Sequence, residues 1–340
     1  MEAGVNEGAP LIHDGVMFLP NPDDVVQAID AASGELLWQY RRTLPPQEKF
    51  LSHYWGQRKR SIFLYKDRIY LVTKDNFVLA LDARTGKEVW QTDRGGDLYI
   101  TNTTGPIVVN GVVIAGSNCQ DAPLTCYVTG HDAETGKELW RNYVVPKKGE
   151  PGDETWGGIP YDQRKHVGTW MPPSYDPELN LLYIGTSVTS PAPKFQLAGN
   201  DKRYLYHNST LAINADTGKL VWYYQHVVDH WDLDHPFERI LVDTAVAPDP
   251  SEVSWINSKI KKGERRKVIT GIPGKTGIVY TLDRRTGEFL WARPTNFQNV
   301  VSKIDGATGA VTVNPETTFT HGGEKHLICP NSNEIGRAHV

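Results

Sequence analysis

Two carboxylates stand one residue apart in this chain, at a spacing that suits the binding of a cation. Asp232 and Asp234 bracket Leu233, and Asp121 supplies a third candidate carboxylate from an earlier stretch. Hard oxygen donors of this kind suit a large cation with about six to eight oxygen ligands. A solvated acidic loop has the same composition, so the spacing alone leaves both interpretations open.

Three histidines close to these carboxylates raise the question of zinc. His226, His230 and His235 lie in the same stretch, but their spacing matches no recognised zinc pattern. The acidic neighbours suit a harder cation. We therefore interpret the histidines as core or turn-capping residues.

Three other side chains could contact a flat or anionic ligand. Trp170, after Gly168 and Thr169, could offer a flat face, although it could also be a packing tryptophan. Lys275 lies between glycines ahead of an apolar strand and could face an anionic or quinone-like ligand, or it could be a turn lysine. Arg60 follows two basic residues, so a surface basic patch is its alternative.

The cysteines leave two alternatives open. Cys119 and Cys126 flank a short loop that contains a proline. They could form a local disulfide in an oxidising compartment, or they could be two buried thiols. The chain has no Cys-x-x-Cys-His motif, so the sequence predicts no c-type haem in this segment.

A nine-residue pattern recurs five times and predicts the elements that position these side chains. Asp or Asn is followed by two residues, Ser or Thr, Gly, three residues and Trp; the copies end at Trp38, Trp90, Trp140, Trp222 and Trp291. The Asp can bond turn amides, and Gly supplies the positive φ. The Trp can pack between neighbouring sheets. Such recurrence indicates a repeat architecture.

The rhythm of short apolar runs and Gly turns predicts an all-β fold built from β-propeller blades. We expect an incomplete propeller of about five blades plus partial ones over residues 1–333. Residues 335–340, written as codons, spell a common sequencing adapter, so we expect 334–340 to be a non-native tail. The long interval between the repeats at 132 and 214 predicts an extra loop, and such loops are usually functional.

Composition argues against two classes of partner. The net charge is −4 and no basic stripe is present, which makes nucleic acid an unexpected partner. No apolar run approaches the roughly 18 residues of a membrane span. The polar residues 1–7 do not resemble a signal peptide.

Taken together, these motifs resemble the pyrroloquinoline quinone (PQQ)-dependent alcohol dehydrogenases, the quinoprotein methanol and ethanol dehydrogenase family. The five Trp-turn repeats match the propeller motif of that family. Residues 127–132, 175–180 and 277–283 match its segments between sites. The resemblance implies an eight-bladed propeller with PQQ and a metal ion at the mouth of the channel.

The resemblance also assigns residues to the cofactor. Trp170 resembles the tryptophan under the PQQ ring, and Thr169 and Thr103 resemble hydroxyls that bond the cofactor. Arg60 resembles the arginine that binds a PQQ carboxylate. Lys275 resembles the cation beside the quinone oxygens.

For the metal and the base, the resemblance points to the aspartates. Asp232 resembles the catalytic base and a metal ligand. Asp234 stands where lanthanide-dependent members carry an extra aspartate, and Asp121 aligns with the metal-binding glutamate of the family. A lanthanide or a calcium ion is therefore implied, with the extra negative charge favouring the trivalent ion.

Two further departures from the family are visible. The metal-binding asparagine of the family aligns near Val188, which cannot be a ligand through its side chain, so Ser187 or Thr189 would have to substitute. The adjacent cysteine pair of the family is absent near Trp55 and Gly56. The first departure weakens the metal site, and the second removes a disulfide ring expected over PQQ.

The resemblance implies a periplasmic enzyme that oxidises a small alcohol to an aldehyde. Its electrons would pass to a cytochrome c or a similar acceptor. The alternative is a non-enzymatic propeller scaffold of the bacterial envelope, built from the same repeats. An enzyme needs the predicted site residues to converge on one cavity near the propeller axis: Arg60, Thr103, Asp121, Thr169, Trp170, Asp232, Asp234 and Lys275.

Overall fold

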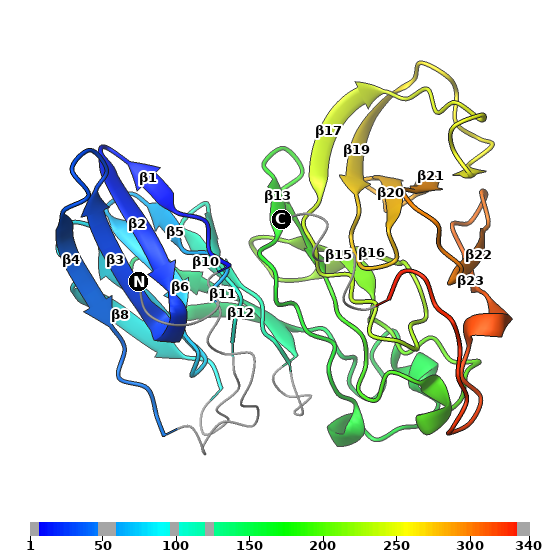
Figure 1. Cartoon of the computed structure of the whole chain (residues 1–340). Helices are drawn as coiled ribbons and strands as arrows, with labels where there is room; N and C mark the ends of the chain where they lie inside the picture. The colour runs from blue at the N-terminus through cyan, green and yellow to red at the C-terminus, as the bar shows by residue number, and fades with distance from the viewer. Residues whose placement is uncertain (1–6, 47–58, 96–101, 120–125, 332–340) are drawn as a thin grey trace. The chain divides into compact units, whose positions relative to one another are not determined.

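The computed structural model describes residues 7–46, 59–95, 102–119 and 126–331. The chain forms two compact units. The first comprises residues 1–144, 168–172 and 215–219, and the second comprises residues 145–167, 173–214 and 220–340. Figure 1 shows the strands of both units, most of them labelled.

Three antiparallel four-stranded sheets make up the first unit (Figure 1), in the orders β1-β2-β3-β4, β5-β6-β7-β8 and β12-β11-β10-β9. Their inner strands are buried and their outermost strands are half exposed, which is the pattern of a propeller blade. The strands are β1 (Leu11–His13), β2 (Val16–Asn21), β3 (Val25–Asp30), β4 (Leu36–Arg41), β5 (Phe63–Tyr65), β6 (Arg68–Val72), β7 (Phe77–Asp82), β8 (Glu88–Asp93), β9 (Ile107–Val109), β10 (Val112–Ala115), β11 (Tyr127–Asp132) and β12 (Glu138–Tyr143).

The second unit contains a four-stranded sheet, a five-stranded sheet of order β17-β19-β20-β21-β18 and the two-stranded sheet β22-β23. The described residues thus hold five sheets of blade size and one smaller sheet, in line with the predicted blades. The strands are β13 (Ser174–Asp176), β14 (Leu181–Gly185), β15 (Ser209–Asn214), β16 (Leu220–Gln225), β17 (Ile240–Ala245), β18 (Trp255–Ile256), β19 (Arg265–Gly271), β20 (Ile278–Asp283), β21 (Phe289–Pro294), β22 (Val301–Ile304) and β23 (Val311–Val313).

Helical structure within the described residues is limited to short 3₁₀ turns: η1 (Pro22–Asp24), η4 (Asp153–Trp156), η5 (Tyr161–Gln163), η6 (Lys194–Gln196) and η7 (Pro315–Thr317). Among these residues, no helix combines the length and apolar character needed to cross a membrane.

The repeated turn forms as its sequence predicts. Oδ1 of Asp82 accepts hydrogen bonds from the amide of Thr85 at 2.9 Å and from its hydroxyl at 2.8 Å. Asp30 and Asp132 make the same contacts in their own turns. A sixth copy that the sequence search missed is the turn at Asp305, because no Trp follows it. The turn is therefore a local structure that does not require the Trp.

Four of the five repeat tryptophans, Trp38, Trp90, Trp140 and Trp222, dock on the turn of the next repeat. Nε1 of Trp90 donates to the carbonyl oxygen of Ala133 at 3.0 Å, and Trp38 and Trp222 make equivalent bonds. Gly136 has φ +77°, and a Cβ added there would lie 2.5 Å from the Trp90 ring. The turn glycine thus supplies both the left-handed backbone and the flat surface that the Trp covers.

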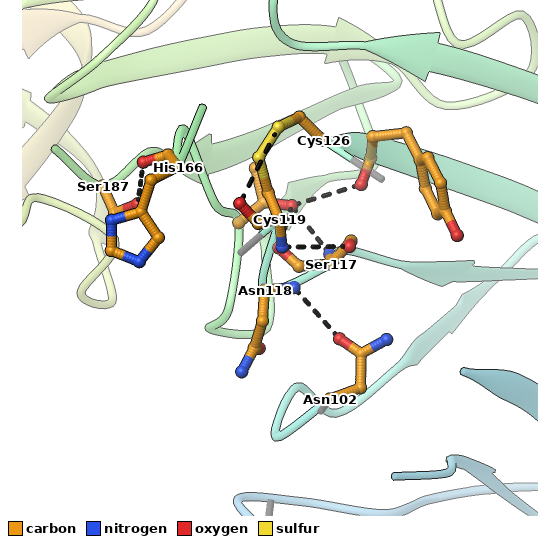
Figure 2. Close-up of a disulfide and its surroundings, with 9 residues drawn as sticks. Asn102, Ser117, Asn118, Cys119, Cys126, His166 and Ser187 are labelled. Carbon is orange, nitrogen blue, oxygen red and sulfur yellow. Dashed lines mark hydrogen bonds between the residues drawn. A yellow bond between two sulfur atoms is a disulfide. The ribbon is translucent and has the colours of Figure 1, made fainter. Parts of the chain in front are cut away.

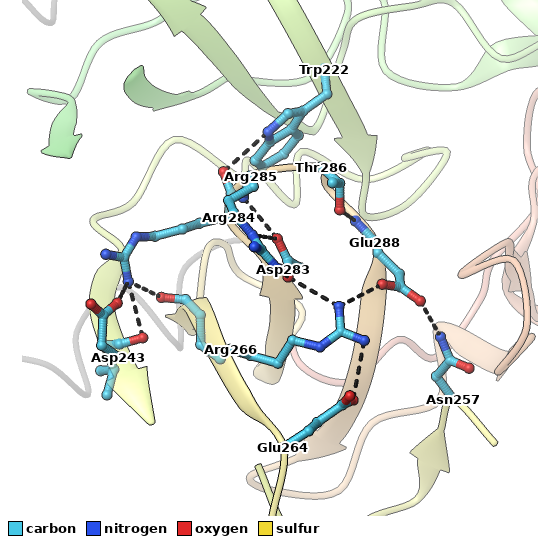
Figure 3. A network of polar contacts seen from close by, with 12 residues as sticks. Trp222, Asp243, Asn257, Glu264, Arg266, Asp283, Arg284, Arg285, Thr286 and Glu288 are labelled. Atoms are coloured by element: carbon cyan, nitrogen blue, oxygen red, sulfur yellow. Dashed lines mark hydrogen bonds and ion pairs between the residues drawn. The ribbon is translucent and has the colours of Figure 1, made fainter. Parts of the chain in front are cut away.

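Ion pairs surround the turn after β20 in the second unit (Figure 3). Arg284, in this turn, pairs with Asp176 at the end of β13 in the neighbouring sheet and with Asp243 on β17 of its own sheet. Arg266 of β19 pairs with Asp283 at 3.1 Å and with Glu288 at 3.0 Å. These ion pairs and the packing of Trp222 stabilise the same turn.

Candidate cofactor and cation sites

The predicted site residues fall into two groups, one in each unit. Arg60, Thr103, Thr169 and Trp170 belong to the first unit, and Asp232, Asp234 and Lys275 belong to the second. Asp121 lies outside the described residues. We call Arg60, Thr103, Asn118 and Trp170 the aromatic cradle, and Asp232, Asp234 and Lys275 the carboxylate cluster.

In the aromatic cradle, a guanidinium lies over an indole. The Arg60 guanidinium carbon is 4.4 Å from the centroid of the Trp170 ring, a cation–π distance. Arg60 also donates to the hydroxyl of Thr103 and pairs with Glu7 at 3.2 Å. Trp170 is half-buried, as Trp38 and Trp90 are, but its ring contacts the Arg60 cation instead of the turn of a neighbouring repeat.

Backbone pairing fixes the position of Trp170. The amide of Thr169 donates to the carbonyl of Ser117 at 2.7 Å, and the amide of Ser117 donates to the Thr169 hydroxyl at 2.9 Å. A Cβ at Gly116 would lie 2.0 Å from the Thr169 carbonyl oxygen, so only glycine permits this approach. The Thr169 hydroxyl is therefore occupied by backbone groups, and its evident structural effect is to place the next residue.

Asn118 is a member of the cradle that the sequence interpretation missed. Its Oδ1 accepts from the Thr103 hydroxyl at 3.2 Å and from the Thr103 amide at 3.3 Å. Its own amide donates to Oδ1 of Asn102 at 3.0 Å, as Figure 2 shows. An asparagine after Gly-Ser carries no motif of its own, so only the fold reveals this contact.

Cys119, the residue after Asn118, forms a disulfide with Cys126. Cys119 and Cys126 are bonded and fully buried, which selects the disulfide alternative over two free thiols (Figure 2). Cys329 is a free cysteine of intermediate exposure.

The carboxylate cluster places one ammonium against two carboxylates. Nζ of Lys275 lies 3.3 Å from Oδ2 of Asp232 and 3.1 Å from Oδ2 of Asp234. The Lys275 amide also donates to the Asp234 carbonyl at 3.0 Å. A Cβ at Gly274 would lie 2.3 Å from that carbonyl oxygen, so the glycine before Lys275 is required for the close approach.

Charge and burial separate the two carboxylates. Burial, together with the charge of Asp234, raises the pKa of Asp232 to about 7. Burial also acts to raise the pKa of Asp234, but Lys275 and the Val188 amide at 3.0 Å more than offset it and hold that pKa below its usual value. A cation beside both groups would relieve the repulsion that raises the pKa of Asp232.

Asp229 and Lys194, which the sequence interpretation did not select, support the turn that carries Asp232. The Asp229 carboxylate accepts from the amides of Trp231, at 2.7 Å, and Leu233. It thereby holds Asp232 in a left-handed conformation with φ +68°. The buried ammonium of Lys194 donates to the Thr189 hydroxyl at 2.8 Å and to the Asp229 carbonyl. The Asp-x-Trp spacing could have revealed the turn, but nothing near Lys194 signals its burial.

The residues around Val188 contribute backbone groups and occupied hydroxyls. Val188 is buried, and its amide rather than its side chain contacts Asp234. The Thr189 hydroxyl donates to the Pro191 carbonyl at 3.0 Å and accepts from Lys194, while the Ser187 hydroxyl donates to the His166 carbonyl at 3.0 Å. Both hydroxyls thus have hydrogen-bond partners already.

The histidines near the cluster are core residues, as interpreted. His226 and His235 are buried and their rings stack at 5.1 Å. Burial lowers the pKa of both and also lowers that of His230, to about 3. Neutral imidazoles in this packing act as ordinary core side chains.

Comparison with known proteins identifies the family. The family model for the β-propeller domain of glucose, ethanol and alcohol dehydrogenases with PQQ matches residues 1–303. The chain belongs to this family. It is 34% identical to the quinohemoprotein alcohol dehydrogenase ADH-IIG of Pseudomonas putida, over 97% of this chain and 45% of the relative. It is 31% identical to the dehydrogenase subunit of the alcohol dehydrogenase (quinone) of Gluconobacter oxydans, over 97% of this chain and 44% of that relative.

Solved structures agree with this placement. The quinohemoprotein alcohol dehydrogenase ADHIIG of Pseudomonas putida HK5 superposes with a TM-score of 0.82 at 33% identity, covering 96% of this chain and 48% of that one. A europium-containing methanol dehydrogenase superposes with a TM-score of 0.82 at 27% identity, covering 96% and 57%. The chain spans about half the length of the curated relatives it matches.

Proposed function

We propose that the protein carrying this chain is a PQQ-dependent dehydrogenase that oxidises a small alcohol to an aldehyde. The observation that carries the proposal is the carboxylate cluster, in which Lys275 lies within 3.3 Å of both Asp232 and Asp234. A proton acceptor and a cation are thus held together on a scaffold whose relatives are named as quinone or quinohemoprotein alcohol dehydrogenases. A half-buried carboxylate whose pKa is raised by burial and by a second carboxylate is typical of a functional site.

The aromatic cradle suits a flat, anionic ring. Trp170 would support the ring, Arg60 would pair with a carboxylate, and the Thr103 hydroxyl completes the proposed cofactor contacts, while Thr169 places Trp170 through its bonds to Ser117. The guanidinium already lies over the indole and beside a hydroxyl, a combination that favours planar anions. When bound, PQQ supplies the acceptor for the hydride that the alcohol loses.

Asp232 is the proposed general base. Its carboxylate would take the proton of the alcohol hydroxyl, and a base within hydrogen-bond reach contributes roughly 10²- to 10⁴-fold to such a step. The backbone turn that carries Asp232 is fixed by the Asp229 carboxylate, which accepts from the amides of Trp231 and Leu233. Lys275 favours the ionised form of Asp232, which is the form that accepts a proton.

A metal ion would be held by Asp232 and Asp234, with Asp121 as the proposed third carboxylate. The donors are hard oxygens, and two of them already share one ammonium. We propose a lanthanide in preference to calcium, because three carboxylates match a trivalent charge. The europium-containing methanol dehydrogenase among the structural neighbours supports that choice.

We further propose a periplasmic location and a cytochrome c or similar electron acceptor. The name of one relative, the 1-butanol dehydrogenase (cytochrome c) of Thauera butanivorans, supports the acceptor; it is 30% identical over 89% of this chain. The buried disulfide is in keeping with an oxidising compartment.

Reconstitution tests the proposal. The purified protein is mixed with PQQ and either La³⁺ or Ca²⁺, and alcohol-dependent reduction of a dye is measured. We expect activity that needs both PQQ and a metal ion. Absence of alcohol-dependent reduction in every combination, with PQQ bound, would contradict an alcohol dehydrogenase.

A further inference from the structure

The Cys119–Cys126 disulfide lies next in the chain to one member of the aromatic cradle. Cys119 follows Asn118 directly, and Asn118 is the hydrogen-bond acceptor for Thr103. We propose that this disulfide is a positioning element of the cradle, so that its loss weakens PQQ binding by releasing Asn118. The inference rests on the proposed function, because it concerns the same ligand.

The hydrogen bonds of the cradle run in one direction. Arg60 donates to the Thr103 hydroxyl, so that hydroxyl has its proton free to donate to Oδ1 of Asn118. The Thr103 amide donates to the same oxygen. If Asn118 moves, the Thr103 hydroxyl must find another acceptor, and its lone pairs no longer point at Arg60. The orientation of the guanidinium over Trp170 therefore depends on Asn118.

The backbone at Cys119 is held in a conformation that cysteine does not favour. Its φ is +51°, in the left-handed region that costs a non-glycine residue roughly 1–2 kcal/mol. Its amide donates to the Ser117 hydroxyl at 3.3 Å, and the bond to Cys126, the residue before β11, anchors its side chain. Without the disulfide, residue 119 is free to relax toward a negative φ. That relaxation rotates the peptide unit that carries Asn118.

Burial makes the disulfide part of the folded core of the first unit. Cys119 and Cys126 both have 0% exposure, and Cys126 immediately precedes β11. Asn118 is 8% exposed and its amide is bonded to Asn102. Because both residues are closely packed, a small rotation at residue 119 should displace Asn118.

Equilibrium dialysis against PQQ at a constant La³⁺ concentration measures the effect. The double variant Cys119→Ser/Cys126→Ser should raise the Kd for PQQ about 10-fold, and Asn118→Ala should raise it by a similar factor. Cys329→Ser removes the free cysteine of the second unit and should leave the Kd unchanged. Thermal midpoints are recorded for every variant, and binding is measured well below each of them.

The triple variant, which combines Asn118→Ala with loss of both cysteines, gives the decisive result. If the disulfide acts through Asn118, the triple variant should bind no more weakly than Asn118→Ala, because the two changes share one pathway. A rescue variant, Cys119→Asn/Cys126→Ser, should recover most of the affinity for PQQ, since asparagine tolerates a left-handed φ. Additive losses, or an unchanged Kd in the double serine variant, would overturn the proposal.

The two proposals fail in different ways. A wild-type protein that does not bind PQQ contradicts the proposed function and, with it, this inference. A wild-type protein that binds PQQ while the double serine variant binds equally well contradicts the positioning role alone.

Discussion

The aromatic cradle and the carboxylate cluster are built on opposite principles. The cradle is a chain of hydrogen bonds that starts at Arg60 and is held by backbone pairing and a disulfide. The cluster is held by charge, with one ammonium within 3.3 Å of two carboxylates. The difference suggests that the two regions have separate roles. The hydrogen bonds and ring contacts of the cradle set affinity for a ligand, while charge near the reacting atoms sets the chemical step.

The energetics of the two regions differ accordingly. Removing one partner from a buried ion pair, such as that of Lys275 with Asp234, leaves an uncompensated charge and costs roughly 3–5 kcal/mol. Removing one neutral hydrogen bond of the cradle costs about 0.5–1.5 kcal/mol. Variants of the cluster should therefore have larger effects on activity than variants of the cradle.

The largest effect is expected from Asp232→Asn. The amide keeps the shape of the side chain but cannot accept a proton, so kcat should fall about 10³-fold while the Kd for PQQ changes less than about 2-fold. Steady-state kinetics with dye reduction, combined with PQQ dialysis, give both numbers. Asp249→Asn, in an exposed turn closed by Ser251, is the matched control. A fall in kcat below 10-fold would remove Asp232 from the role of base.

The next effect separates the two metal ions. Asp234→Ala should abolish activity supported by La³⁺, a loss of at least about 100-fold, and spare activity supported by Ca²⁺. With Ca²⁺, the wild-type cluster carries surplus negative charge, so removing one carboxylate is tolerated. Dye reduction with each ion at saturating PQQ measures the difference. Equal activity of the wild type with both ions, or indifference to the change, would contradict the lanthanide preference.

A smaller effect, confined to affinity, is expected from the cradle. Trp170→Ala removes the flat face under the Arg60 guanidinium and should raise the Kd for PQQ about 30-fold, which corresponds to about 2 kcal/mol. Turnover at saturating PQQ should change less than about 3-fold. Trp170→Phe keeps an aromatic face and should recover most of the affinity. If Trp170→Ala lowers turnover more than affinity, the division between the two regions is wrong.

The smallest effect on activity is expected from acid. Acid should instead change the stability of the two units to different extents. Burial lowers the pKa of His131 in the first unit, to about 4, and that of four histidines in the second: His207, His226, His230 and His235. Unfolded histidine titrates near 6.5, so below that pH the unfolded state binds more protons and the free energy of unfolding decreases as pH falls toward the folded pKa values.

We therefore expect the second unit to lose amide protection at a higher pH than the first. Hydrogen exchange measured between pH 7 and pH 4, read separately for β9–β12 and for β13–β16, makes the comparison. Loss of protection in both sheets at one pH would show that the buried histidines do not decide which unit opens first.

The sequence predicted those features that depend on neighbours in the chain. The turn at Asp82 is closed by bonds to a residue three positions away, so its motif specifies it without reference to the rest of the fold. The sixth turn, at Asp305, was missed because the search required a Trp whose role is to contact another sheet. The resemblance also selected Lys275, Asp232 and Asp234, which the structure brings together as a cluster.

The sequence did not predict residues whose role depends on partners far away in the chain. Asn118 became visible through its bond to Thr103, and Lys194 through its burial against the turn of Asp229. Neither lies in a motif, because an asparagine or a lysine in a loop is usually solvated. The Thr169 hydroxyl, expected at the cofactor, is bonded to the backbone at Ser117.

By itself, the sequence determined the blades of this protein, because the Asp, Thr and Gly of each turn satisfy one another within a few residues. The tertiary structure alone decided which loops meet. Arg60 reaches Thr103 across 43 positions, and Lys275 reaches Asp234 across 41. The physical reason is that a turn closes through local hydrogen bonds, whereas a contact between loops forms only after packed sheets have fixed where each loop begins.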